Sequence, residues 1–156
     1  MPADSAPPPP PAIRLEASTI CQLRCPCCPT AKGEIREALG SGFLTLERFR
    51  RIVDGSGVQH VELANWGEVL LNPHLIEILA HAARTGVRLT IDGGANLNHL
   101  PGEVAEALVA HRLYRLTCAI DGATQETYAT YRRGGDLARV LANVDAINEA
   151  KARCGS

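Results

Sequence analysis

Strand-like and helix-like segments alternate four times along this chain, and that alternation limits the fold more than any other feature. The expected strands cover about residues 13–18, 58–63, 87–91 and 115–120. A segment with helical periodicity follows each strand. Thr45 and Asp136, which are typical N-cap residues, precede two of these helices. Repeated strand–helix units predict an α/β fold with a parallel sheet and right-handed crossovers.

The length of the chain limits how much of a barrel it can form. A complete (β/α)8 barrel needs about 250 residues, whereas this chain has 156. We therefore expect a partial, TIM-like barrel of about four β-α units. Residues 13–156 form the expected core domain, which ends after the fourth unit. Residues 1–12 hold six of the ten prolines and are expected to be a disordered arm.

Composition excludes several classes of function. The 16 basic residues balance 17 acidic ones, and only 4% of residues are aromatic, so we expect no nucleic-acid partner. No apolar run reaches the roughly 18 residues of a membrane span. The first residues lack the basic and apolar regions of a signal peptide. Six cysteines without a secretory signal are typical of a reducing cytoplasm, where clustered cysteines bind metal or do redox work.

Four of the six cysteines lie within eight residues, directly after the first expected strand. They are Cys21, Cys25, Cys27 and Cys28. The carboxyl end of a strand is where α/β folds bind ligands. Read as Cys-x3-Cys-x2-Cys, the thiolates of Cys21, Cys25 and Cys28 can hold three irons of a [4Fe–4S] cluster. The fourth iron would then lack a protein ligand, unlike in ordinary four-thiolate clusters.

The cysteine spacing resembles that of the radical S-adenosylmethionine (SAM) superfamily, and three downstream segments extend the resemblance over about residues 13–153. Trp66-Gly67-Glu68 looks like the Gly-Gly-Glu-Pro segment of that family, with Val69 in place of the proline. Asp92-Gly93-Gly94 stands where relatives have Thr-Asn-Gly. The segment around Asp121-Gly122, with Arg132-Arg133 beyond it, resembles the SPASM-associated branch, which modifies peptides and small molecules.

The resemblance implies a cofactor set and a chemistry. SAM would bind the open iron of a [4Fe–4S] cluster, and Trp66, Gly67 and Glu68 would hold its amino group. Asp121 would contact the ribose, and Cys27 would line the adenine pocket. A reductant such as flavodoxin or ferredoxin would supply one electron, SAM would split, and a 5′-deoxyadenosyl radical would take hydrogen from an unknown peptide or small-molecule substrate. No catalytic residue is assigned.

Other interpretations stay open at this stage. The chain could be a truncated, non-catalytic iron–sulfur fragment or one half of a split enzyme, completed by a second chain. The cysteines could form a zinc site, although zinc prefers four converging ligands. Several residues also have structural interpretations. Glu68 would be an exposed acid, Asp92 and Asp121 turn residues, and Cys118 a small core side chain; the Arg132-Arg133 pair would lie on the surface or contact an anion.

Overall fold

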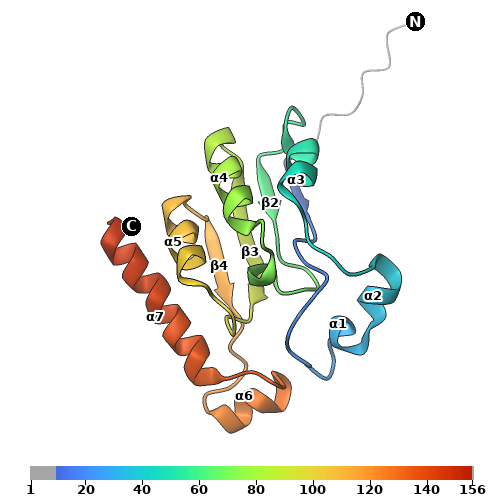
Figure 1. Cartoon of the computed structure of the whole chain (residues 1–156), viewed down its shortest axis with the longest axis vertical. Coiled ribbons are helices and arrows are strands. Elements are labelled where there is room, and N and C mark those ends of the chain that lie inside the picture. The colour runs from blue at the N-terminus through green and yellow to red at the C-terminus, as the bar shows by residue number, and fades with distance from the viewer. Residues whose placement is uncertain (1–9, 156) are drawn as a thin grey trace, which may run out of the picture.

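Four parallel strands form a single sheet, as the sequence predicts. The computed structural model describes residues 10–155, so most of the expected disordered arm lies outside the described part. The strands are β1 (Ala12–Arg14), β2 (His60–Glu62), β3 (Arg88–Ala95) and β4 (Arg115–Cys118), in the order β1-β2-β3-β4 (Figure 1). All three neighbouring pairs are parallel. This is the expected α/β sheet of a partial barrel.

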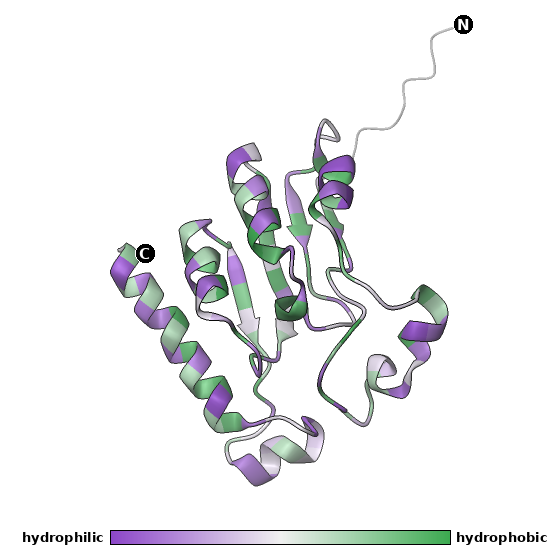
Figure 2. Cartoon of the chain, in the orientation of Figure 1, coloured by the Kyte–Doolittle hydropathy of each residue, from purple (hydrophilic) through white to green (hydrophobic). Residues whose placement is uncertain are grey.

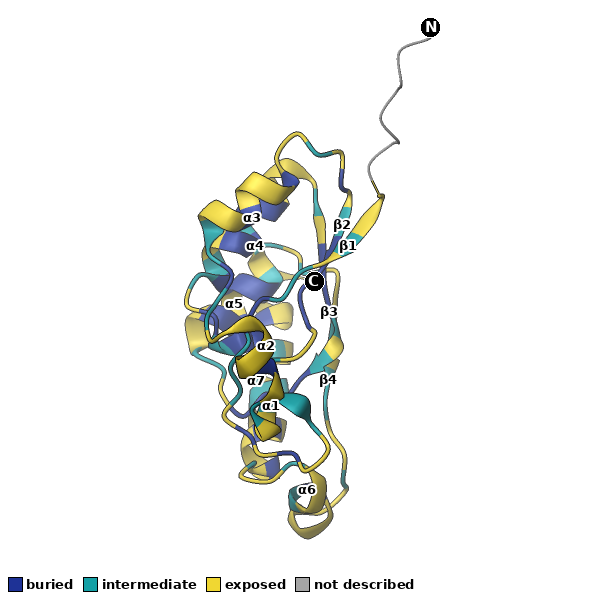
Figure 3. Cartoon of the chain, turned by 90° about the vertical axis from the view of Figure 1, so that its right-hand side faces the viewer, coloured by how far each residue is buried: buried dark blue, intermediate teal, exposed yellow. Residues whose placement is uncertain are grey.

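Helices cover one face of this sheet. They are α3 (Leu46–Val53), α4 (Leu75–Thr85), α5 (Gly102–Ala110) and α7 (Leu137–Cys154). In the side view of Figure 3, α3, α4 and α5 lie on one side of the strands, and no helix of the described residues covers the opposite face. Apolar and polar residues are interleaved along α7 (Figure 2), as expected for a helix with one packed side. No helix within residues 10–155 has the length and apolar character needed to cross a bilayer.

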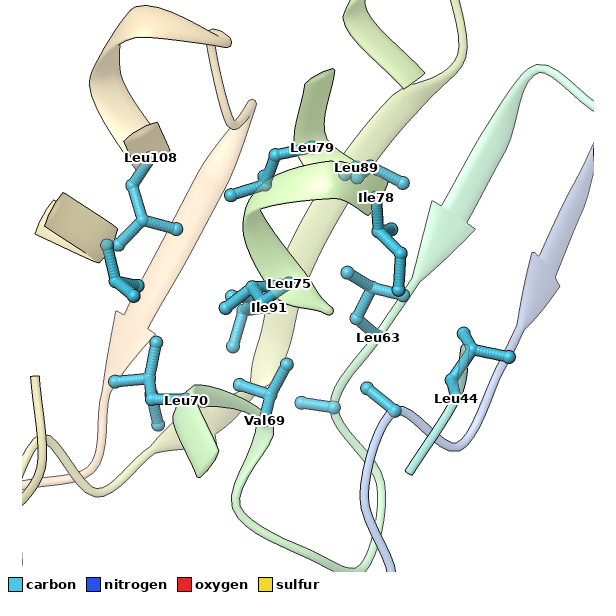
Figure 4. Close-up of a cluster of buried hydrophobic side chains, with 14 of the residues drawn as sticks. Leu44, Leu63, Val69, Leu70, Leu75, Ile78, Leu79, Leu89, Ile91 and Leu108 are labelled. Atoms are coloured by element: carbon cyan, nitrogen blue, oxygen red, sulfur yellow. The ribbon is translucent and has the colours of Figure 1, made fainter. Parts of the chain in front are cut away.

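The core lies between the sheet and these helices. Figure 4 shows side chains of α4 facing those of the strands, with Ile78 opposite Leu63 and Leu75 beside Ile91. Ile78 and Ile91 have no exposed surface, and neither has Phe49 of α3. Full burial of such a side chain contributes roughly 1.5–3 kcal/mol relative to an exposed position. This packed layer fixes the sheet, and the sheet in turn fixes the loops at its ends.

Three helix starts follow the capping residues in the sequence. The side chain of Thr45 accepts a hydrogen bond from Arg48 N at 3.3 Å, and that of Asp136 accepts one from Arg139 N at 3.1 Å. Thr124 caps α6 (Gln125–Tyr131) through a capping box. These side chains satisfy backbone N–H groups that have no partner inside the helix.

The connection after the cysteines contains two short helices. Residues 30–43 are rich in glycine and charged residues, a composition typical of a loose loop, but they hold α2 (Glu34–Leu39) and most of α1 (Pro29–Lys32). Gly33 separates the two helices with a φ of 88°, a value that glycine adopts without strain. Pro29 opens α1, where its missing N–H costs no helical hydrogen bond. Short helices broken by glycine leave too little periodicity for sequence reasoning to detect.

The start of α4 and the end of β3 lie further along the chain than the sequence pattern indicates. Asn72-Pro73 has the pattern of a cap residue followed by proline at the first helical position, but α4 begins two residues beyond Pro73, with His74 as its N-cap. Asn72 instead ends the 3-10 helix η1 (Val69–Leu71). Its side-chain amide donates hydrogen bonds to Ala17 O, before the cysteine loop, and to Leu44 O, just before α3. Strand β3 runs on to Ala95, with an irregular register after Ile91. Residues 92–94 therefore belong to the strand.

Candidate functional site

The loops that carry the predicted site residues meet at one end of the sheet. In Figure 1 the strand arrows point toward α1, α2 and α6, which lie beyond the carboxyl ends of the strands. The cysteine loop follows β1, residues 66–68 follow β2, residues 96–98 follow β3, and Asp121 follows β4. Parallel pairing thus brings together four segments that are far apart in the sequence.

The four clustered cysteines have different environments. Cys25 is buried, Cys21 and Cys28 are half-buried, and Cys27 is exposed. The pKa of Cys21 is raised to about 11, chiefly by burial and also by the neighbouring Glu68, Cys25 and Cys28. Burial raises the pKa of Cys25 as well, and Cys28 adds to that effect. The three predicted ligands are therefore neighbours in space.

This donor set fits an iron–sulfur cluster. Within residues 10–155, no three His, Cys, Asp or Glu side chains converge closely enough to hold one metal ion. A [4Fe–4S] cluster demands less convergence, because each thiolate binds a different iron. Three neighbouring thiols on one loop suit such a cluster, whereas a closed zinc site needs four ligands around a single ion.

Arg132 connects the cysteine loop to the segment after β4. Its Nε donates to Asp121 Oδ2 at 2.5 Å, and its Nη1 lies 4.0 Å from Cys25 Sγ. The guanidinium lowers the pKa of Cys25, although burial raises that pKa more strongly. The anion-contacting interpretation of Arg132 thus fits the structure, and the surface interpretation fits Arg133, which is exposed. Asp121 does more than shape a turn, because it fixes this guanidinium.

Glu68 is buried, which rules out the exposed-acid interpretation. Only 4% of its surface is exposed, and burial raises the pKa of its carboxyl group. Its Oε1 accepts from Leu70 N at 3.1 Å, and its Oε2 accepts from Asn96 N at 2.7 Å. A carboxylate held by two backbone N–H groups has a fixed position and still has free lone pairs for a cation.

The packing of the backbone around position 67 leaves room only for glycine. A Cβ at this position would lie 1.9 Å from Ser18 O and 2.8 Å from Ile20 N. Glu68 N also donates to Ile20 O at 2.8 Å. The backbone at Gly67 therefore lies close against the start of the cysteine loop. It locks the Trp66-Gly67-Glu68 segment onto that loop.

Glu16 holds the same segment from the other side, and sequence reasoning missed it. Its carboxylate accepts from Trp66 N at 3.2 Å and from Gly67 N at 3.2 Å. Thr30 donates from Oγ1 to Trp66 O at 2.8 Å, and 41% of the surface of Trp66 is exposed. Glu16 gives little signal in the sequence, where it reads as one of the polar residues of the first strand.

Asp92 lies away from the cysteines in the strand itself, which corrects its interpretation as a turn residue. Arg115 of β4 donates to both carboxylate oxygens of Asp92, each at 2.5 Å. This hydrogen-bonded pairing lowers the pKa of Asp92. Cys118, at the end of β4, packs partly buried against the core, as the structural interpretation expected.

Comparison with known proteins agrees with this geometry. The family model described as the Radical SAM superfamily matches residues 15–155. The AdoMet-dependent heme synthase of Methanosarcina barkeri is 28% identical over 141 residues, which cover 88% of this chain and 39% of that protein. A GTP 3′,8-cyclase of Alkaliphilus oremlandii is 31% identical over 140 residues, covering 88% of this chain and 42% of the cyclase.

Solved structures share the fold. Streptococcus suis SuiB bound to S-adenosylmethionine superposes with a TM-score of 0.73 at 18% identity, over 92% of this chain and 32% of that one. Methylornithine synthase (PylB) gives a TM-score of 0.64 at 18% identity, over 89% of this chain and 41% of that chain. The chain thus spans about two fifths of the length of the curated relatives it matches.

Proposed function

The chain belongs to the radical SAM superfamily, and from that premise we propose that it binds a [4Fe–4S] cluster and SAM and cleaves SAM reductively. The product would be a 5′-deoxyadenosyl radical that abstracts hydrogen from a substrate. One observation supports the proposal most strongly: the thiols of Cys21, Cys25 and Cys28 are close to one another, and the buried carboxylate of Glu68 lies near Cys21.

The residues of the chain would place and shield the cofactors. Cys21, Cys25 and Cys28 would each bind one iron, and the bound cluster would supply the electron that splits SAM. The carboxylate of Glu68 would receive the SAM ammonium group. Its position is set by the N–H groups of Leu70 and Asn96, so little reorganisation is needed on binding.

The remaining predicted residues would shape the nucleoside side of the site. Asp121 would accept from the ribose hydroxyl groups, with its carboxylate oriented by Arg132. Cys27 and Trp66 are both exposed, and they would contact the adenine and the methionine end of SAM. The SPASM-associated branch stays a prediction, as do a peptide or small-molecule substrate, a flavodoxin or ferredoxin reductant and a cytoplasmic location.

Reductive SAM cleavage tests the proposal directly. The protein is reconstituted anaerobically with iron and sulfide, SAM and dithionite are added, and 5′-deoxyadenosine is measured by mass spectrometry. We expect product from the wild type and from Cys118→Ala, a cysteine outside the cluster loop, and none from Cys25→Ala. A wild-type protein that carries a cluster but forms no product would contradict the proposed activity. It would favour a non-catalytic fragment or one half of a split enzyme.

A further inference from the structure

We propose that Asn96 is a positioning residue whose carboxamide donates a hydrogen bond to the cluster-binding sulfur of Cys21 and raises the reduction potential of the cluster. The inference rests on the proposed function and deepens it. It assigns a role to a residue outside the cysteine loop and outside the Trp66-Gly67-Glu68 segment.

Asn96 is buried at the start of the loop after β3, beside the predicted metal ligand Cys21. Only 3% of its surface is exposed. Its Nδ2 lies 3.6 Å from Cys21 Sγ. The neighbouring Gln22 forms a reciprocal amide pair with it: Gln22 Nε2 donates to Asn96 Oδ1 at 3.0 Å, and Asn96 Nδ2 donates to Gln22 Oε1 at 3.3 Å.

The hydrogen bonding fixes which end of the amide faces the sulfur. The backbone N–H of Asn98 lies 2.9 Å from Asn96 Oδ1. A backbone N–H can only donate, so the atom it meets must be the carbonyl oxygen. The NH₂ end of Asn96 therefore faces Cys21. An inverted amide would place two donors against each other in a buried site.

Asn96 is held in place by its own backbone N–H group and by the neighbouring residue Asn98, which is itself anchored by hydrogen bonds. Asn98 donates from Nδ2 to the hydroxyl of Tyr128 at 2.7 Å and accepts from Asp136 N at 2.7 Å. The backbone N–H of Asn96 donates to Glu68 Oε2 at 2.7 Å. One residue thus contacts a predicted iron ligand with its side chain and the predicted SAM-binding carboxylate with its backbone. Changing only the side chain separates the two contacts.

The expected effect on the cluster follows from charge. An iron-bound thiolate accepts hydrogen bonds and cannot donate them. Reduction adds negative charge to the cluster and its sulfurs, so a donor stabilises the reduced state more than the oxidised state. Hydrogen bonds to the sulfurs are among the factors that set iron–sulfur potentials. Loss of the Asn96 amide should therefore make the cluster harder to reduce.

The test is an EPR-monitored redox titration of the reconstituted full chain. We expect the midpoint potential of Asn96→Leu to be more negative than that of the wild type. Asn96→Asp keeps the shape of the side chain, removes the NH₂ donor and adds negative charge, so its potential should be lower still. This variant also serves if the leucine variant does not fold.

Asn143→Leu is the matched control. Asn143 Nδ2 donates to Leu97 O at 2.7 Å, so it supports the same loop without touching a cysteine. Its potential should equal that of the wild type. Equal potentials in the wild type and both Asn96 variants would overturn the inference, and so would equal shifts in the Asn96 and Asn143 variants. A wild type that assembles no cluster would instead refute the proposed function itself.

Discussion

At the scale of single residues, burial separates cysteines that look alike in the sequence. Cys27 is exposed between the buried Cys25 and the half-buried Cys28. The pKa of Cys21 is raised to about 11, chiefly by burial. Since the thiolate is the nucleophile, protonation and access should both slow the reaction of Cys21 in the cluster-free protein.

Alkylation of the cluster-free chain tests this difference. At pH 7.5 iodoacetamide should modify Cys27 well before Cys21, because a thiol with a raised pKa stays protonated at neutral pH. Labelling of Cys21 should increase as the pH approaches 11. Peptide mass spectrometry resolves the two sites. Equal labelling rates at pH 7.5 would show that Cys21 is not held in the half-buried position described above.

At the scale of elements, the sequence predicted which strands and helices form more accurately than it predicted the residues at which they begin and end. The caps at Thr45 and Asp136 were found because capping depends on neighbouring residues. The extension of β3 beyond Ile91 was missed because the strand is irregular there and rich in glycine. Asn96 was missed for a different reason: its partner Cys21 lies 75 residues away, and no local pattern encodes such a contact.

Gly67 provides a test at this scale, because it lets the segment after β2 lie against the cysteine loop. Gly67→Ala should lower the melting temperature and the free energy of unfolding, since the new Cβ would meet the backbone of Ser18 at 1.9 Å. Overpacking typically costs about 1–3 kcal/mol, and rigid backbone atoms place this case at the upper end or beyond.

Gly102→Ala is the control for that substitution. A Cβ at Gly102, in the first turn of α5, meets nothing within 4 Å. Alanine there should leave stability unchanged or raise it by up to about 1 kcal/mol. Thermal unfolding followed by circular dichroism compares the two variants. A Gly67→Ala protein as stable as the control would contradict the described packing of this segment on the cysteine loop.

A hydrogen bond between His81 of α4 and Asp54, at the end of α3, joins these two helices. His81 Nε2 lies 2.7 Å from Asp54 Oδ1, and Arg84 donates to His81 Nδ1 at 2.7 Å. Since Nδ1 accepts, Nε2 carries the hydrogen that is donated to Asp54. The hydrogen bond from His81, together with that from Arg50, lowers the pKa of Asp54 below its ordinary value of 3.8.

The lowered pKa of Asp54 makes the stability of the fold depend on pH. A lowered pKa in the folded state gives a stabilising contribution that is complete above about pH 4 and is lost as the pH falls through the folded-state value. Urea unfolding between pH 6 and pH 3 should therefore show a smaller acid-induced loss of stability in Asp54→Asn than in the wild type. An identical loss in both proteins would mean that this pair does not contribute.

At the scale of the whole molecule, the two faces of the sheet differ in chemistry. The helix-covered face is apolar, whereas the register aligns Arg14, Glu62, Thr90 and Arg115 in one row on the other face. Glu62 is buried among backbone N–H groups, with Oε1 accepting from Asp92 N at 2.8 Å and Gly93 N at 3.1 Å. A polar inner face is consistent with a barrel that encloses a polar site.

The proposed function depends on the three cluster ligands. The iron and sulfide content of the protein after anaerobic reconstitution is therefore the most direct test of the proposed function. We predict that Cys21→Ala, Cys25→Ala and Cys28→Ala each lose the brown [4Fe–4S] chromophore with its iron and sulfide. Cys27→Ala, altered on the same loop, should keep both at the wild-type level. Loss of the cluster in Cys27→Ala, or a wild type that binds zinc in place of iron and sulfide, would contradict the account.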